Sequence, residues 1–159
     1  MQAILDDSDL ARFAPRNRLD RLMREYERNY ERIRLLVPGL RRLRGRCVSR
    51  APAMPDLHIE VLEQSAYTTT LVMNYALEID GSRLPEPEVQ VRVYHDARMA
   101  EVLAVREPGP TGGRAWCSLR HSAMSRKWRF NRFLAKWLAY CLQQGHGRFE
   151  SPAAAGAPA

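Results

Sequence analysis

Two segments of the chain repeat apolar residues at intervals of three and four positions. This spacing puts the apolar side chains on one face and predicts an amphipathic α-helix in each segment. The first segment begins near Asn17, a suitable N-cap, and ends at Pro38-Gly39. The second begins near Lys127, ends near Gln144 and precedes Gly145, a residue typical of helix C-termini. The apolar positions are Leu19, Leu22, Met23, Tyr26, Tyr30, Ile33 and Val37, then Phe130, Phe133, Leu134, Trp137, Leu138, Cys141 and Leu142.

Four shorter runs between these segments alternate apolar with polar residues, at 57–64, 67–79, 89–94 and 99–106. Such alternation predicts strands, and the short breaks between the runs predict antiparallel pairing. The Arg-rich stretch 38–55 indicates a basic connecting loop, and the Gly/Pro-containing stretch 107–126 indicates a flexible loop. We therefore expect an α+β fold: a four-stranded antiparallel β-meander flanked by an N-terminal and a C-terminal amphipathic helix packed on one face.

The length of 159 residues fits a single domain. We expect a mobile lead-in over residues 1–15, one α+β domain over 16–148, and a disordered Ala/Pro-rich tail over 149–159. No apolar run in the sequence approaches the roughly 18 residues that span a bilayer. The acidic start of the chain is also unlike a secretory signal. These features predict a cytoplasmic protein without a membrane partner.

The net charge of +7 is unevenly distributed. Residues 12–50 carry 13 arginines against four acids, whereas residues 51–110 carry ten acids against four arginines. If the basic loop meets the second helix, the two form one surface for phosphates or another acidic partner. The alternative is two solvated basic faces that pair with the acidic strands. The candidate contacts are Arg41, Arg42, Arg44, Arg46, Arg126, Lys127, Arg129, Arg132 and Lys136.

One predicted hairpin gathers chemically active side chains, in Tyr94-His95-Asp96-Ala97-Arg98 and in Glu101 beyond it. His95 could act as a general base near neutral pH, oriented by Asp96. The structural alternative is that Asp96 closes the turn through the main chain and Tyr94 packs against its neighbours. In that alternative Arg92 or Arg98 pairs with Glu101.

No metal or cofactor is expected from the sequence. Three cysteines, Cys47, Cys117 and Cys141, lie far apart and are odd in number, which favours reduced thiols. The histidines share no metal-ligand spacing. The sequence has no glycine-rich phosphate loop of the Walker type and no Ser/His/Asp constellation.

Four sets of motifs form a distinctive combination. They are Tyr26-Glu27-Arg28-Asn29-Tyr30 with Leu36-Val37-Pro38; Tyr67-Thr68-Thr69; Val93-Tyr94-His95-Asp96-Ala97 with Ala100-Glu101-Val102; and Asn131-Arg132-Phe133-Leu134 with Trp137-Leu138 and Cys141-Leu142. Together they resemble the YqiB-like bacterial family, a domain of unknown function, over about residues 17–147. The resemblance implies no catalytic residue, since none is established for that family. It marks Tyr94, His95, Asp96, Asn131 and Trp137 as family-motif positions.

These patterns favour a non-catalytic cytoplasmic binding or adaptor domain with a basic surface for an acidic partner, either protein or nucleic acid. The alternative is an enzyme that acts on a nucleotide or other phosphorylated metabolite through His95, Asp96 and Glu101.

Overall fold

The computed structural model of the chain describes residues 15–151. Residues 1–14 of the expected lead-in and residues 152–159 of the expected tail lie outside this range. None of the helices within it is long and apolar enough to cross a membrane. In chain order the elements are α2 (Pro15–Leu36), the 3-10 helix η1 (Leu40–Arg42), β1 (Gly45–Ser49), β2 (Asp56–Gln64), β3 (Thr68–Ile79), β4 (Ser82–Tyr94), β5 (Met99–Pro108), β6 (Arg114–Ser118) and α3 (Met124–Gln143).

The strands form one antiparallel sheet in the order β1-β2-β3-β4-β5-β6. The α+β class and the antiparallel meander are confirmed, but the prediction of four strands is wrong because the sheet has six. The four predicted runs became β2 to β5, and β1 and β6 extend the sheet at its two edges. Each added strand has only five residues and lies where Arg, Gly and Pro indicate a loop. Short, charged edge strands are common in natural sheets and carry little period-two signal.

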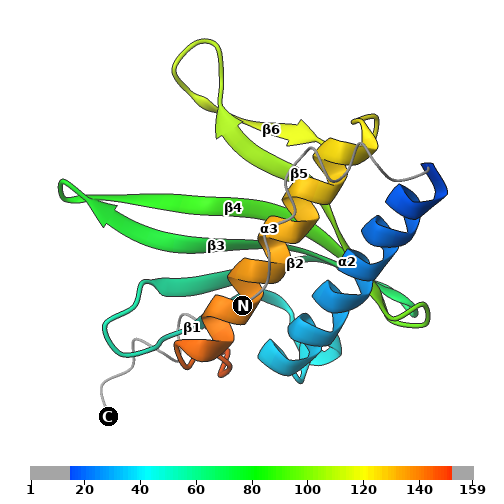
Figure 1. The fold of residues 1–159 in the computed structure, drawn as a ribbon. Helices are drawn as coiled ribbons and strands as arrows, with labels where there is room; N and C mark the ends of the chain where they lie inside the picture. The colour runs from blue at the N-terminus through cyan, green and yellow to red at the C-terminus, as the bar shows by residue number, and fades with distance from the viewer. Residues whose placement is uncertain (1–14, 152–159) are drawn as a thin grey trace.

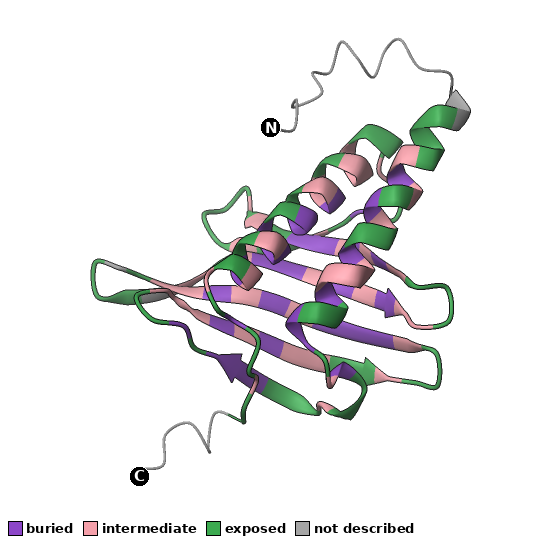
Figure 2. Ribbon diagram, turned by 60° about the horizontal axis from the view of Figure 1, so that its bottom comes forward, coloured by how far each residue is buried: buried purple, intermediate pink, exposed green. Residues whose placement is uncertain are grey.

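The two helices lie side by side across one face of the sheet (Figure 1). Buried residues line the layer between the helices and the strands (Figure 2). Leu36 from α2 and Leu134 and Leu138 from α3 are fully buried there, together with Leu57 and Leu71 from the sheet. Both predicted apolar stripes therefore contribute buried residues to the core, although Leu19 at the start of the α2 stripe is 48% exposed.

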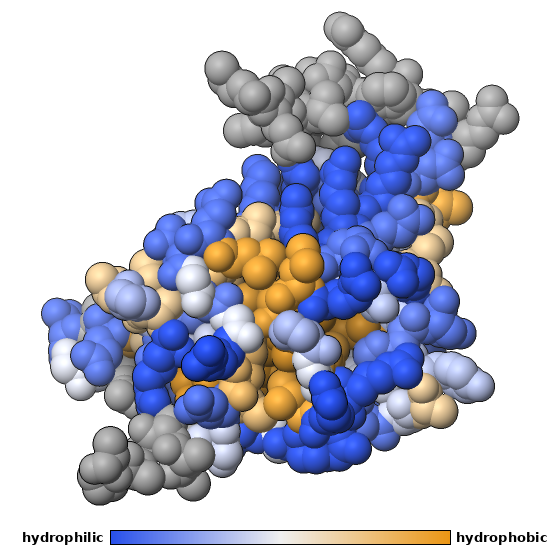
Figure 3. Space-filling model, turned by 90° about the horizontal axis from the view of Figure 1, so that it is seen from below, coloured by the Kyte–Doolittle hydropathy of each residue, from blue (hydrophilic) through white to orange (hydrophobic). Residues whose placement is uncertain are grey.

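The apolar stripe of α3 is not buried throughout. Trp137 is 6% exposed and packs edge-on against Tyr75 of β3, with ring centroids 5.4 Å apart. Phe133, one turn earlier, is 40% exposed and stacks on the outer side of Trp137. Figure 3 shows apolar side chains that remain accessible on the face seen from below, with hydrophilic side chains around them.

Two asparagines seal the part of the β5 edge that β6 does not cover. Asn29 of α2 donates its amide to the carbonyl of Ala100, and Asn131 Oδ1 accepts from the N–H of Val102 at 2.9 Å. The amide of Asn131 donates to the Lys127 carbonyl one turn back in α3. Both asparagines are fully buried. The family-motif residue Asn131 therefore joins the last helix to the sheet edge.

The predicted helix stop at Gly145 is confirmed. Gly145 has a φ of 94°, its N–H donates to Leu142, and the N–H of His146 donates to Cys141. This pair of bonds is a Schellman turn, which glycine favours because it has no Cβ. The turn directs the following residues to β1, where the main chain of Glu150 pairs with Val48.

Candidate anion-binding pocket

A pocket of about 290 Å³ lies where α2 ends, η1 begins and β4 finishes. Pro38 cannot continue the helix, and the buried Leu40 anchors the next turn, which leaves Arg41 and Arg42 exposed. We call this cavity the α2–η1 pocket. Its apolar wall includes Tyr30, Ile33, Val37 and Val93, and its polar side chains are Arg34, Arg41, Arg42 and His95.

The α2–η1 pocket is positively charged. Three guanidinium groups line it, and no carboxylate does. Arg34 also contacts Glu31, with 3.3 Å between Nη2 and Oε2. No ion pair is found for Arg41 or Arg42 among residues 15–151. These two side chains therefore carry charge that the described part of the protein leaves unbalanced.

His95 is held by a chain of hydrogen bonds that starts at the pocket rim. Gln64 Nε2 donates to the carbonyls of Leu40 and Leu43, which turns its Oε1 toward Thr69. Thr69 Oγ1 donates to that oxygen at 2.6 Å. Thr69 Oγ1 also lies 2.7 Å from His95 Nε2, and because its only proton is already used it must accept there. Nε2 therefore carries the hydrogen, and Nδ1 carries the lone pair of the neutral ring.

The surroundings of His95 favour this neutral ring. Burial, followed by the nearby Arg41 guanidinium, lowers the pKa of His95 below its ordinary value, while Asp96 acts in the opposite direction. The histidine in the free pocket is therefore a hydrogen-bond acceptor at neutral pH.

Neither of the other two candidate catalytic residues lines the α2–η1 pocket. Asp96 is exposed in the turn after β4. Glu101 lies opposite Arg92 in the register of β4 and β5 and alternates with the buried Ala100 and Val102. Its side chain therefore lies on the other side of β5 from those of Ala100 and Val102, where Tyr94 and Tyr26 of α2 approach it. His95 shares the α2–η1 pocket with Ile33 on the helix side, so the structure does not bring His95 and Glu101 together.

Glu101 instead accepts a hydrogen bond from Tyr94 Oη at 2.6 Å. Burial first, and the Glu101 carboxylate second, raise the pKa of Tyr26. Burial and the hydrogen bond to Glu101 also raise the pKa of Tyr94. The two phenols stay protonated around one carboxylate. Within residues 15–151 no ion pair joins Glu101 to either predicted arginine: Arg92 donates to Thr70, and Arg98 contacts Glu31 at 2.7 Å.

Of the nine basic residues singled out in the sequence, Arg41 and Arg42 line the α2–η1 pocket. Arg44 donates to the Arg41 and Leu43 carbonyls, and Arg126 contacts Glu107. Arg132 approaches Glu25, which is only 3% exposed and also contacts Arg28. Lys127 is half-buried, whereas Arg129 and Lys136 are exposed on α3. Helix α3 begins at the end of the helix pair that lies opposite η1 (Figure 1). The nine basic residues therefore do not form one patch.

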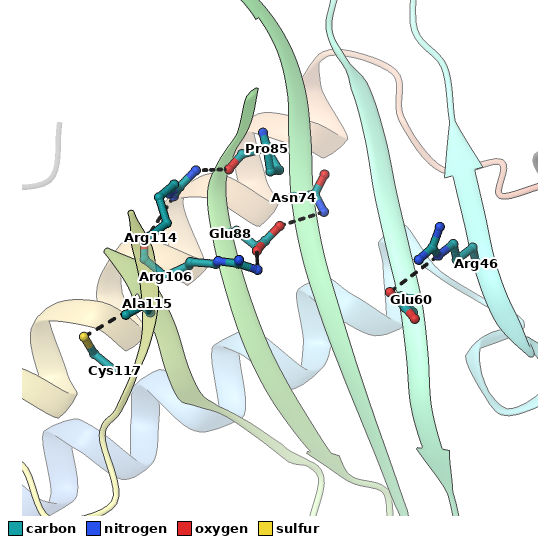
Figure 4. A network of polar contacts seen from close by, with 9 residues as sticks. All are labelled: Arg46, Glu60, Asn74, Pro85, Glu88, Arg106, Arg114, Ala115 and Cys117. Carbon is teal, nitrogen blue, oxygen red and sulfur yellow. Dashed lines mark hydrogen bonds and ion pairs between the residues drawn. The ribbon is translucent and has the colours of Figure 1, made fainter. Parts of the chain in front are cut away.

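The open face of the sheet holds a second polar cluster, drawn in Figure 4. Glu88 is 7% exposed and lies 3.1 Å from Arg106 and 3.3 Å from Asn74. Arg46 lies 3.7 Å from Glu60 on β2. A groove of about 340 Å³ runs between these residues. The two carboxylates that line this groove, Glu60 and Glu88, each contact an arginine. No group of three or more metal-ligating side chains occurs in the described range 15–151.

The fold and its polar sites define a small α+β domain with a basic pocket where α2 ends and η1 begins. The chain belongs to the family described as "Protein of unknown function (DUF1249)", which matches residues 32–147. It is 30% identical over 125 residues to the "Uncharacterized protein YqiB" of Escherichia coli strain K12, which covers 78% of this chain and 88% of that protein. The same values hold for the proteins of that name from the O6:H1 and O157:H7 strains. No solved structure matches. The resemblance noted in the sequence is confirmed.

Proposed function

We propose that this protein is a non-catalytic cytoplasmic binding domain whose acidic partner docks at the α2–η1 pocket. The observation that carries the proposal is the convergence of Arg34, Arg41 and Arg42 on one pocket that no carboxylate lines. Guanidinium groups bind carboxylates and phosphates through paired, charge-assisted hydrogen bonds. An anionic group of the partner would supply the acceptors that this pocket lacks.

The pocket is a better candidate than the basic residues of α3. Arg126 and Arg132 already contact Glu107 and Glu25, so part of their charge is balanced within the protein. Arg129 and Lys136 are exposed, and neither lines the α2–η1 pocket. Isolated surface charges give weak, salt-sensitive attraction rather than a defined site.

A binding role also fits the placement of the hairpin residues better than catalysis does. General acid–base catalysis needs its proton-transfer groups within reach of the same substrate atoms. His95 lines the α2–η1 pocket, whereas Glu101 does not line it and its carboxylate accepts a hydrogen bond from Tyr94.

Fluorescence anisotropy would test the proposal with three labelled probes: mixed RNA, mixed single-stranded DNA and a polyglutamate peptide. The test variant is Arg41→Ala with Arg42→Ala. The matched control is Arg129→Ala with Lys136→Ala, which removes the same charge from α3. We expect the pocket variant to weaken binding of at least one probe about tenfold or more, and the control about twofold or less. Equal losses in both variants would rule out the pocket as the docking site, and no binding at low salt would rule out these macromolecular partners.

A further inference from the structure

We propose that the anionic group which enters the α2–η1 pocket is a phosphomonoester, and that His95 takes up a proton on Nδ1 when it binds. This inference rests on the proposed function and specifies its ligand. It depends on two features: the number of guanidinium groups in the pocket, and the hydrogen-bond chain that fixes the His95 tautomer.

The charge of the pocket matches a dianion better than a monoanion. Arg34, Arg41 and Arg42 line the pocket. Of these three, Arg34 is the one whose charge is partly offset, because it contacts Glu31. A phosphomonoester carries about −1.5 to −2 at pH 7 and presents three acceptor oxygens. A phosphodiester or a carboxylate carries a single negative charge. Arg41 and Arg42, which have no carboxylate partner in the described chain, therefore gain most from a terminal phosphate.

The rest of the pocket suits the organic part of a small phosphate ester. Tyr30, Ile33 and Val93 supply an aromatic and aliphatic wall beside the arginines. A volume of about 290 Å³ lies at the lower end of the range for small-molecule sites. That space fits a phosphate with one ring or a short side chain. A folded nucleic-acid segment would not enter it.

The proton uptake follows from the hydrogen-bond chain. Because Thr69 accepts from Nε2–H, the neutral His95 ring offers only the Nδ1 lone pair to a ligand. A dianionic phosphate oxygen brings lone pairs of its own and would be repelled. One proton placed between the two atoms turns this repulsion into a charge-assisted hydrogen bond.

The charged groups around His95 determine whether ligand binding raises or lowers the proton affinity of its ring. Arg41 of η1 opposes the protonation of the ring, and Asp96 in its own turn favours it. Arg34 of α2 and Arg42 of η1 are the other charged groups that line the pocket, and the Tyr30 ring forms part of its apolar wall. A bound dianion neutralises the arginines and raises the proton affinity of Nδ1. At pH 8, where the free ester and the free ring are both deprotonated, the complex gains about one proton.

Isothermal titration calorimetry of the full chain would test this with phenyl phosphate and phenyl sulfate, which have the same shape but different charges. Titrations at pH 7 and pH 8, in two buffers with different heats of ionisation, give the number of protons taken up. We expect phenyl phosphate to bind at least tenfold more tightly than phenyl sulfate at pH 7. We also expect uptake of about one proton at pH 8, and an affinity for phenyl phosphate that falls by up to about tenfold from pH 7 to pH 8.

Two variants separate the proton linkage from simple charge attraction. His95→Gln should abolish proton uptake and make the affinity for phenyl phosphate independent of pH between 7 and 8. Thr69→Val removes the acceptor for Nε2–H, so the neutral ring can carry its hydrogen on Nδ1 and donate without taking up a proton. This variant should retain binding at pH 8 while its proton uptake falls. Circular dichroism confirms that both variants are folded.

Two further titrations distinguish the source of the phosphate. Ribose 5-phosphate, which carries one ring, represents a metabolite, and a phosphoserine peptide represents a modified protein; the tighter ligand assigns the source. Equal affinity for phenyl phosphate and phenyl sulfate, or phosphate binding without proton uptake, would overturn this inference. If both anions bind and Arg41→Ala with Arg42→Ala removes both, the proposed function survives. If no anion binds, both proposals fail.

Discussion

Asn29 and Asn131 are 102 positions apart in the chain, yet Asn29 Nδ2 lies 3.2 Å from Asn131 Oδ1 beside the edge of β5. Asn131 accepts from the Val102 N–H as well, so one side chain satisfies two buried donors. A buried donor that loses its partner costs about 1–3 kcal/mol. The contact therefore connects both helices to the same point of the sheet.

Asn131→Ala should lower the free energy of unfolding by about 3 kcal/mol, because the Val102 N–H loses its acceptor and the Asn29 amide loses one of its contacts. Urea denaturation measures the change. Gln143→Ala, at an exposed position of the same helix, should stay within about 0.5 kcal/mol of the natural chain. Equal stability of Asn131→Ala and Gln143→Ala would contradict the sealing role.

Trp137→Ala should destabilise the protein by about 3–5 kcal/mol, since the ring is 6% exposed and packs on Tyr75. Phe133→Ala provides a matched comparison, because it removes an aromatic ring of the same helix that is 40% exposed. We expect a loss of about 1 kcal/mol there. The midpoints of urea unfolding separate the two variants, and a larger loss for Phe133→Ala would show that the burial is assigned wrongly.

Arg41→Gln should raise the pKa of His95, because it removes a positive charge that disfavours protonation of the ring. Burial, the larger cause, remains, so the pKa should stay below the ordinary value. Titration of the His95 ring signals by NMR gives the change, and Arg129→Gln on α3 is the control. A His95 pKa that falls or does not move in Arg41→Gln would place the guanidinium away from the ring.

Acid should weaken the fold partly through His146, which is 4% exposed and packs against Tyr75. Burial lowers the pKa of His146 below 6.5, so the unfolded chain takes up this proton first as the pH falls. The contribution of the neutral ring to stability is complete above about pH 6.5 and is lost as the pH falls through the folded-state pKa.

The measurement for His146 is unfolding by urea at several values between pH 7 and pH 5. His146→Gln should show a smaller decline in stability over this range than the natural chain. His121→Gln, which changes an exposed histidine, should show the same decline as the natural chain. An unchanged pH dependence in His146→Gln would exclude this residue as a source of acid sensitivity.

The elements that could be predicted are those whose pattern is local. Leu134, Leu138 and Cys141 recur at helical spacing and are all fully buried. β1 could not be predicted in this way, because Cys47, Val48 and Ser49 are buried in succession. Ser49 is buried because of a long-range contact: its Oγ lies within hydrogen-bond distance of His146 Nδ1 and accepts from the N–H of Gly147, about a hundred positions later in the chain.

The pocket was only partly predictable for the same reason. Arg41 and Arg42 stand out in the sequence, but Arg34 has the appearance of an ordinary helix-surface residue paired with Glu31. Thr69 and Gln64 contact His95 and the pocket rim only after β2, β3 and β4 have paired. The motif Tyr67-Thr68-Thr69 was the one available sign that Thr69 matters. The catalytic grouping of His95 with Asp96 and Glu101 stays a prediction that the geometry does not favour.

The amide of Gln64 donates to the carbonyls of Leu40 and Leu43, which flank Arg41 and Arg42 in the chain. The main chain at the mouth of the pocket is thus fixed to the sheet in the unliganded protein. Association would require the ordering of a few side chains but little folding of a loop, which reduces the entropic penalty of capture. A rigid mouth of this kind suits rapid, reversible exchange of a small charged group.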